Sequence, residues 1–216
     1  MKSMQIIYYT DPLCCWSWVM EPALERLRTK LGAQAQWRYC MGGLLPDWNS
    51  FVDPVNSVTR PIQMGPVWMH AAEVGGVKID HSLWFRDPPA SSYPACVAVK
   101  CVELQSAAYV PGFLQKLREE CMTNGLNIAK EEVLLNTASM LQKQFPSFNS
   151  DRFTDDLCNG NGREAFRADL HEVQVKNITR FPSLLIRRPE QPSILIAGYR
   201  QYESLMELFA VADEVG

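Results

Sequence analysis

A cysteine at a predicted strand-to-helix junction is the residue best placed in this chain to do chemistry. Cys14 follows an apolar run at 5–10 and stands near the start of 12–31, where apolar residues recur at steps of three and four. A sulfur at such a junction lies near the free N–H groups of the first helical turn, which stabilise an anion. We therefore expect a lowered pKa for Cys14 and a thiolate that acts as a nucleophile.

Ser17 limits what Cys14 can do. It stands where a C-x-x-C motif would have its second cysteine. A second thiol resolves a mixed disulfide by intramolecular attack, whereas a serine hydroxyl is too weak an acid to do so at neutral pH. Ser17 can instead donate a hydrogen bond to the sulfur of Cys14 or of glutathione. The resolving thiol must come from elsewhere, and we rank glutathione first, Cys40 second and Cys15 third.

Pro182 is the second part of the predicted catalytic site, which consists of Cys14, Ser17 and Pro182. It lies directly before an apolar, strand-like run at 183–187. X–Pro bonds adopt the cis form far more readily than other peptide bonds. A cis bond here would turn the backbone N–H and C=O of the preceding residue toward the sulfur, where they can pair with an extended substrate.

The neighbours of Cys14 and Pro182 provide the predicted substrate contacts. Trp16 flanks the thiol as an apolar platform, although it also fits the apolar stripe of the helix. Phe181 carries the backbone groups that a substrate would meet, and Cys15 adjoins the nucleophile in the chain. We therefore predict that Trp16, Phe181 and Cys15 contact the substrate.

The other cysteines and the histidines are predicted to be structural or isolated. Cys96 and Cys101 are five residues apart on one predicted helix and so do not share a face. No C-x-x-C or H-x-x-x-H spacing predicts a zinc site, and we expect no metal. The remaining members of this set are Cys121, Cys158, His70, His81 and His171.

The charge and the apolar content of the sequence exclude nucleic acids and membranes as predicted partners. The 216 residues carry a formal net charge of −3, with no basic stripe for nucleic acid and no Lys/Arg cluster for a membrane surface. No apolar run approaches the roughly 20 residues of a transmembrane helix, and the start of the chain lacks the features of a signal peptide. We expect a cytoplasmic protein with mostly free thiols. Its predicted partners are thiol or disulfide proteins or small molecules, not nucleic acid or membranes.

The order of predicted elements joins the two ends of the chain in one α/β domain. The strand–helix–strand unit at 5–41 predicts a parallel strand pair with a right-handed crossover. An all-helical region follows, and the chain ends with two strands and a helix. We therefore predict a discontinuous domain at 1–60 and 176–216, interrupted by a helical domain at 61–175. The predicted helices after the first are at 61–74, 94–105, 111–124, 130–145, 162–175 and 201–212, and the predicted strands are at 5–10, 34–41, 183–187 and 193–197.

The segment Asp11-Pro12-Leu13-Cys14-Cys15-Trp16-Ser17-Trp18 resembles the Asp-Pro-x-Cys-x-Trp-Cys-Trp signature of cytoplasmic DsbA-like proteins, including FrnE-type dithiol–disulfide isomerases. Arg180-Phe181-Pro182-Ser183 looks like their cis-proline segment, and the stretch 89–96 resembles the opening of a helix in their inserted domain. The resemblance implies a thioredoxin fold with a helical insertion, Cys14 as nucleophile and Pro182 as the cis-proline. It does not provide a resolving cysteine, so the site is a C-x-x-S variant.

The sequence is compatible with three functions. We favour a monothiol disulfide oxidoreductase that acts through Cys14 with glutathione as co-substrate and no tightly bound cofactor. A second reading is a glutathione-dependent transferase or isomerase, similar to kappa-class glutathione transferases and 2-hydroxychromene-2-carboxylate isomerases. A third is a non-enzymatic redox sensor or adaptor, because Asp-Pro-Leu-Cys followed by Glu21-Pro22 resembles thioredoxin-like adaptors of the ClpXP protease. The docking face of such an adaptor would contain Trp16, Trp18, Trp48, Trp68 and Trp84.

Overall fold

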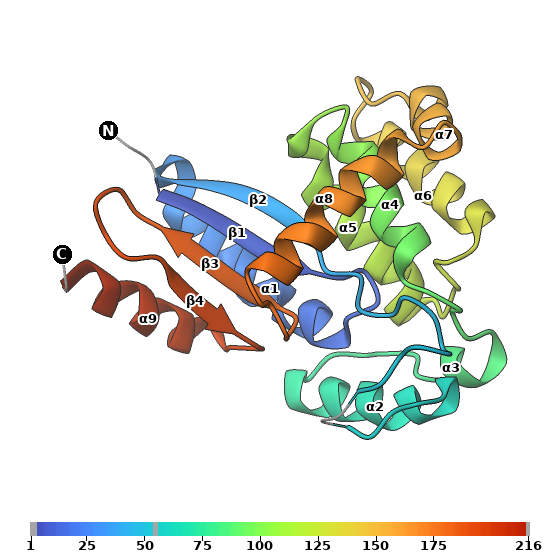
Figure 1. The fold of residues 1–216 in the computed structure, drawn as a ribbon, viewed down its shortest axis with the longest axis horizontal. Coiled ribbons are helices and arrows are strands. Elements are labelled where there is room, and N and C mark those ends of the chain that lie inside the picture. The colour runs from blue at the N-terminus through green and yellow to red at the C-terminus, as the bar shows by residue number, and fades with distance from the viewer. Residues whose placement is uncertain (1–3, 54–55, 215–216) are drawn as a thin grey trace.

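A mixed four-stranded sheet lies on one side of the molecule, on the left in Figure 1, with the helical insertion on the other. The computed structural model describes residues 4–53 and 56–214. The strand order is β2-β1-β3-β4; β1 pairs with β2 in parallel, and the β1–β3 and β3–β4 pairs are antiparallel. The two ends of the chain therefore build one sheet, as the sequence predicts. The strands are β1 (Met4–Thr10), β2 (Ala35–Met41), β3 (Ser183–Arg187) and β4 (Ile194–Ala197).

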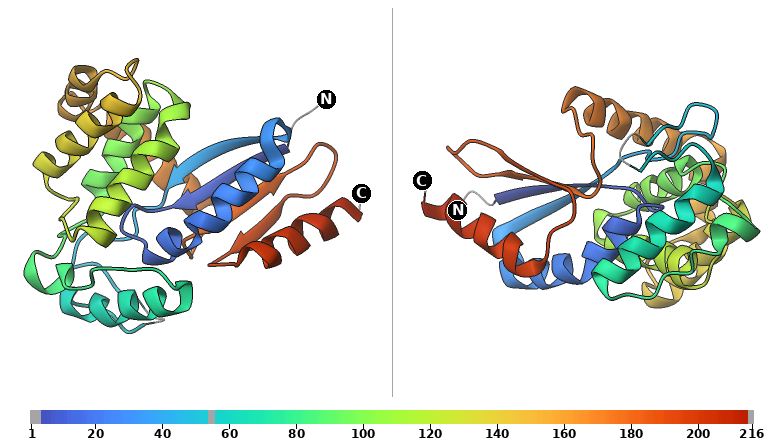
Figure 2. Two further views of the ribbon diagram at one scale, coloured as in Figure 1. Left: turned by 180° about the vertical axis from the view of Figure 1, so that it is seen from behind. Right: turned by 90° about the horizontal axis from the view of Figure 1, so that it is seen from below.

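Helices cover both faces of this sheet. Helix α1 (Cys15–Leu31) and helix α9 (Tyr202–Glu214) lie together on one face, and α8 (Asn161–Val175) contacts β2 from the other (Figure 2). The element order is β-α-β, a helical insertion, then β-β-α. The predicted thioredoxin fold with an inserted helical region is therefore confirmed.

The insertion contains more helices than the sequence predicted. Helix α7, missed from the sequence, begins after Asn149, whose side chain accepts a hydrogen bond from the backbone N–H of Arg152. Asparagine at that position is a common helix start signal. A π-helical turn at Glu119–Thr123 extends α5. The predicted domain boundaries at 60/61 and 175/176 stay a prediction. The helices are α2 (Met64–Gly75), α3 (Leu83–Arg86), α4 (Tyr93–Glu103), α5 (Val110–Arg118), α6 (Glu131–Gln144), α7 (Ser150–Cys158) and α8.

The two faces of the sheet carry separate apolar clusters. Along β1, Ile6 and Tyr8 belong to the large core under α1, whereas Ile7 and Tyr9 belong to a small cluster on the α8 side. This alternation follows from the two-residue period of a strand. Cys40 in β2 belongs to the small cluster, on the face of the sheet that α8 covers.

The predicted tryptophan docking face is wrong for Trp68 and Trp84, which are buried, whereas Trp16, Trp18 and Trp48 are partly exposed. Trp68 and Trp84 are only 0% and 2% exposed. Their rings meet edge to face at a centroid distance of 5.1 Å, and the ring of Trp48 meets Trp84 at 5.9 Å. Trp68 and Trp84 therefore fill the packing between α2 and α3, with the partly buried Trp48 against them, as large apolar side chains usually do. None of the helices in the described residues is both long and apolar enough to span a bilayer.

Candidate functional site: a buried cysteine at the start of α1

A tight turn after β1 places Cys14 at the start of α1. One carboxylate oxygen of Asp11 accepts the backbone N–H of Leu13 at 2.8 Å, and the backbone N–H of Cys14 donates to the carbonyl of Asp11 at 3.1 Å. Cys14 is the N-cap residue, and its carbonyl accepts the N–H groups of Ser17 and Trp18. The predicted strand-to-helix junction is therefore present, and the sulfur sits at the first helical turn.

The segment before β3 lies against this sulfur. The Phe181–Pro182 peptide bond is cis, as the sequence predicts. The thiol of Cys14 donates to the carbonyl oxygen of Phe181 at an S···O distance of 3.5 Å. Residues 167 positions apart in the chain thus meet at one point, because β3 pairs with β1 in the sheet.

A series of buried hydrogen bonds fixes the side chain of Ser17 near Cys14. Its side chain is 0% exposed, and its oxygen accepts the hydroxyl of Thr10 at 2.9 Å. The guanidinium group of Arg118 donates to the hydroxyl oxygen of Thr10 and, at 3.4 Å, to the backbone carbonyl of Asp11. The hydroxyl that replaces a resolving thiol is therefore fixed in the core.

Arg118, the last residue of α5 in the insertion, places a buried positive charge against α1 and β1. It is 0% exposed and forms an ion pair with Glu21 of α1 at 2.7 Å. Glu21 also pairs with Arg28, and the ring of Tyr8 lies 5.9 Å from the Arg118 guanidinium carbon. Arg118 was not among the site residues predicted from the sequence. The available signal was its position four residues after Leu114, on the apolar face of α5, where a charge requires a partner.

Asp11 is a second buried group that the sequence analysis did not identify as part of the site. Besides Leu13, its carboxylate accepts the backbone N–H of Leu44 at 2.7 Å, the hydroxyl of Ser92 at 2.9 Å and the thiol of Cys96 at 3.3 Å. It therefore joins the active-site turn to the loop after β2 and to the start of α4. Burial raises the pKa of Asp11, while the hydrogen bonds that it accepts lower it.

The lowered pKa expected for Cys14 is wrong. Burial is the largest influence and raises the pKa of the Cys14 thiol above its ordinary value. Hydrogen bonds from Ser17 lower this pKa, the charge of Asp11 raises it and the charge of Arg118 lowers it. Cys14 is only 5% exposed, so the loss of hydration outweighs the favourable contacts at the helix start.

The two cysteines predicted as possible resolving thiols, Cys40 and Cys15, are both buried. The thiol of Cys40 lies on the α8 side of the sheet and donates to the backbone carbonyl of Asp169, with an S···O distance of 3.7 Å. Cys15 is 3% exposed and packs into the core under α1, where burial raises its pKa well above the ordinary value. All seven cysteines are free thiols in the structure.

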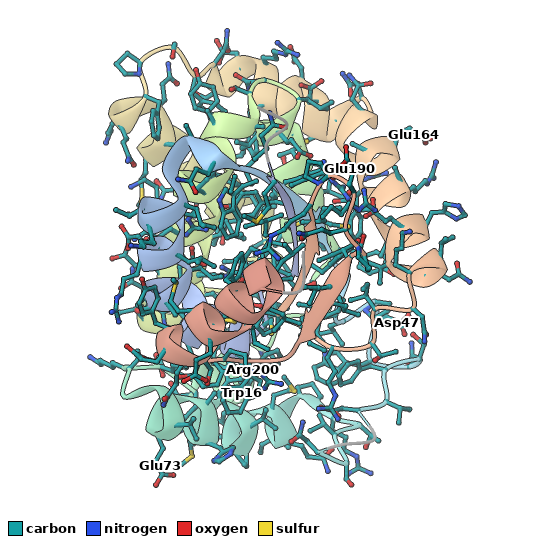
Figure 3. All side chains as sticks on the ribbon, turned by 90° about the vertical axis from the view of Figure 1, so that its left-hand side faces the viewer. Trp16, Asp47, Glu73, Glu164, Glu190 and Arg200 are labelled. Carbon is teal, nitrogen blue, oxygen red and sulfur yellow. The ribbon has the colours of Figure 1, made fainter. Side chains whose placement is uncertain are left out.

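The two predicted aromatic contacts, Trp16 and Phe181, pack against different parts of the molecule. Trp16 is partly exposed, and its ring meets those of His70 at 5.6 Å and Tyr199 at 5.7 Å. Figure 3 shows it between α2 and the residues before α9. Phe181 instead packs over Gly42 at the end of β2, where a Cβ atom would lie 2.2 Å from its ring. The side chain of Phe181 is therefore a structural contact, while its carbonyl faces the sulfur.

A cavity of about 680 Å³ opens in the helical insertion, but it is separate from this site. Its walls come from α4, α6, α7 and α8, and none of Cys14, Ser17, Phe181 or Pro182 lines it. No group of three His, Cys, Asp or Glu side chains suited to a metal ion occurs in the described part of the chain.

Comparisons with known proteins agree with this arrangement. A family model described as Thioredoxin matches residues 8–207. The ClpXP adapter protein SpxH of Halalkalibacterium halodurans is 27% identical over 209 residues, covering 96% of this chain and 67% of that protein. This chain thus spans about two thirds of the length of such curated relatives.

Two solved structures share the fold at lower identity. A proposed protein disulfide isomerase from Nitrosomonas europaea has a TM-score of 0.79 at 21% identity, with 97% of each chain covered. The cytosolic disulfide reductase DsbM of Pseudomonas aeruginosa has a TM-score of 0.72 at 17% identity, covering 98% of this chain and all of that one. At these identities the likeness shows the fold alone.

Proposed function

The chain belongs to the thioredoxin family, and we propose that it acts as a protein-binding adaptor rather than as a turnover enzyme. The observation that carries this proposal is the state of Cys14. Its thiol is 5% exposed, its pKa is raised by burial, and the hydroxyl at position 17 cannot resolve a mixed disulfide. A nucleophile in this state neither ionises readily nor completes a catalytic cycle within the chain.

The names of the curated relatives support the same reading. They are ClpXP adapter proteins, aligned over nearly the whole of this chain. An adaptor needs a stable surface that a client protein recognises, and it needs no released product. The proposal is that this chain binds a protein client in the cytoplasm and presents it to ClpXP.

The surface beside Cys14 is suited to such a client. Trp16, His70 and Tyr199 form a partly exposed aromatic group, and Met69 of α2 is 53% exposed on the same helix as His70. Aromatic and methionine side chains are enriched at protein interfaces because they bury large area with few rotatable bonds. We propose this group as the client contact.

Complementation separates the adaptor from an enzyme. Proteins that accumulate both without this chain and without ClpX are the candidate clients. We expect Cys14→Ser to restore their normal levels as the wild type does, because the thiol is not used. Trp16→Ala should fail to restore them, whereas Phe85→Ala, which removes a 77% exposed aromatic side chain from α3, should restore them. Failure of Cys14→Ser with success of Trp16→Ala would contradict the adaptor proposal.

A second candidate is a glutathione-linked disulfide oxidoreductase, favoured by the contact of the Cys14 thiol with the carbonyl of Phe181. In that reaction the Cys14 thiolate attacks a substrate disulfide, forms a mixed disulfide and releases one substrate thiolate. Glutathione thiolate then attacks the substrate sulfur, which leaves Cys14 as thiolate and the substrate bonded to glutathione. Glutathione is the co-substrate of this candidate.

Ser17→Cys tests whether the site geometry supports that chemistry. The variant restores a C-x-x-C pair, and we expect it to reduce insulin disulfides faster than the wild type, because the second thiol resolves the intermediate. Ser17→Ala is the matched control and should stay at the wild-type rate. Equal rates for all three proteins would remove the oxidoreductase candidate. The transferase or isomerase reading has less support, because the 680 Å³ cavity is not lined by Cys14 or Ser17.

A further inference from the structure

The cavity in the helical insertion has an apolar floor. Tyr93 and Val97 of α4, Leu134 of α6 and Phe166 of α8 line it. The rings of Tyr93 and Phe166 meet edge to face at 5.0 Å, which holds both in place. Its volume of about 680 Å³ lies within the range of small-molecule sites.

One wall of the cavity is positively charged. Arg163 and Arg167 both line it from α8, and their spacing of four residues places them on the same side of the helix. Arg167 pairs with Glu164 at 3.1 Å, and Glu164 projects outward from α8 (Figure 3). Arg163 makes no hydrogen bond or ion pair with any residue that the structure describes.

The part of the lining that comes from α6 carries a negative charge. Glu131 lines the cavity from the first turn of α6. A carboxylate group on a ligand is therefore attracted to the α8 wall and repelled at the α6 wall. A ligand with one anionic end and an apolar body matches this distribution of charge.

We propose that the cavity binds a small amphipathic carboxylate, such as a medium-chain fatty acid. The apolar body lies against Tyr93, Val97 and Phe166, and the carboxylate pairs with Arg163 and Arg167. The planar guanidinium group suits this role because it binds a carboxylate through two parallel hydrogen bonds. The site is independent of Cys14 and goes beyond the proposed adaptor function.

Cys158 provides a reporter inside the cavity. It lines the cavity and is exposed, while the other six cysteines are buried. In a Cys14→Ser background, 2,2′-dithiodipyridine is a neutral disulfide reagent that should react first at Cys158. The Cys158 thiolate attacks one reagent sulfur, forms a mixed disulfide and releases one equivalent of thiopyridone, which absorbs light.

The experiment measures the rate at which Cys158 reacts with 2,2′-dithiodipyridine as a function of dodecanoate concentration, which is kept below the micelle concentration. We expect saturable protection of Cys158, with the rate falling about tenfold as the ligand fills the cavity. Dodecanol, which has the same chain without the charge, should require about fivefold higher concentration. Absence of protection by dodecanoate, or equal protection by both compounds, would overturn the proposal.

Charge-reversal variants locate the anionic end. Arg163→Glu should raise the dodecanoate concentration for half protection by about tenfold, because attraction becomes repulsion. Lys176→Glu makes the same change at the C-cap of α8, outside the cavity lining, and should leave the value unchanged. If Arg163→Glu does not fold, Arg163→Gln replaces it, with an expected increase of about threefold. The same value for the Arg163 variant and for Lys176→Glu would refute the assigned orientation.

Discussion

Cys14 and Cys158 are two free thiols in very different surroundings. Cys14 follows a recognisable motif, yet it is 5% exposed and lies among buried partners, including a carbonyl, a hydroxyl and the charge of Arg118. Cys158 has no motif, but it is exposed at the edge of a cavity with Arg163, an arginine that lacks a described partner.

The contrast teaches that a motif predicts where a thiol stands and not how reactive it is. A helix start favours the thiolate of Cys14, but burial removes water from the sulfur and raises its pKa. The tightly packed region is suited to holding a fixed shape, as the proposed adaptor function requires. The loosely partnered region is suited to a ligand that arrives from solution.

The largest expected difference between the two regions concerns their arginines. Arg118→Met removes a buried positive charge. The hydroxyl oxygen of Thr10 and one carboxylate oxygen of Glu21 then lose the guanidinium group that donates to them. We expect a loss of about 3–5 kcal/mol in the free energy of unfolding, measured by urea denaturation. Arg163→Met, the counterpart in the cavity, should change it by less than about 0.5 kcal/mol. Similar losses of unfolding free energy in Arg118→Met and Arg163→Met would show that the two arginines do not differ in this way.

The next largest effect concerns the packing of the cis-proline segment. In Gly42→Ala the new Cβ would meet the Phe181 ring at 2.2 Å, so the ring must shift from its packed position. We expect a destabilisation of about 1–3 kcal/mol in the same assay. Gly65→Ala is the control, because its Cβ would meet nothing nearer than 3.9 Å and alanine favours helix. A neutral Gly42→Ala would show that this region is not tightly packed.

Thiol labelling compares the two cysteines directly. With iodoacetamide at pH 7.5 and the folded protein, we expect Cys158 to be alkylated first and Cys14 to react at least about tenfold more slowly. The physical reason is the burial of Cys14 and its raised pKa. Peptide mass spectrometry of quenched samples measures both rates. Faster labelling of Cys14 would restore the reactive-nucleophile interpretation.

The smallest effect is a change in the pH dependence of stability. The pKa of Cys14 is raised in the folded state, so the unfolded chain loses this proton first as pH rises above about 8.5. Stability is full below that pH and declines above it. Between pH 8 and 9.5, Cys14→Ala should lose about 1 kcal/mol less than the wild type. Parallel pH profiles would mean that the thiol pKa is not raised.

Local patterns in the sequence predicted much of the fold. Apolar periodicity located the strands at both ends of the chain and most helices between them, and Pro182 before a strand indicated the cis-proline segment. Helix α7 was missed because its apolar residues are few, although Asn149 marked its start. Trp68 and Trp84 were wrong as members of a docking face, because side-chain size indicates burial more strongly than recognition.

The sequence by itself determined that a cysteine would stand at the start of α1 and that a serine would replace its resolving partner. Only the tertiary structure decided the environment of that cysteine. Arg118 and the carbonyl of Phe181 are distant in the chain, and Cys40 is turned to the opposite face of the sheet. Desolvation and charge depend on contacts in space, so spacing along the chain could not reveal that Cys14 would be buried and its pKa raised.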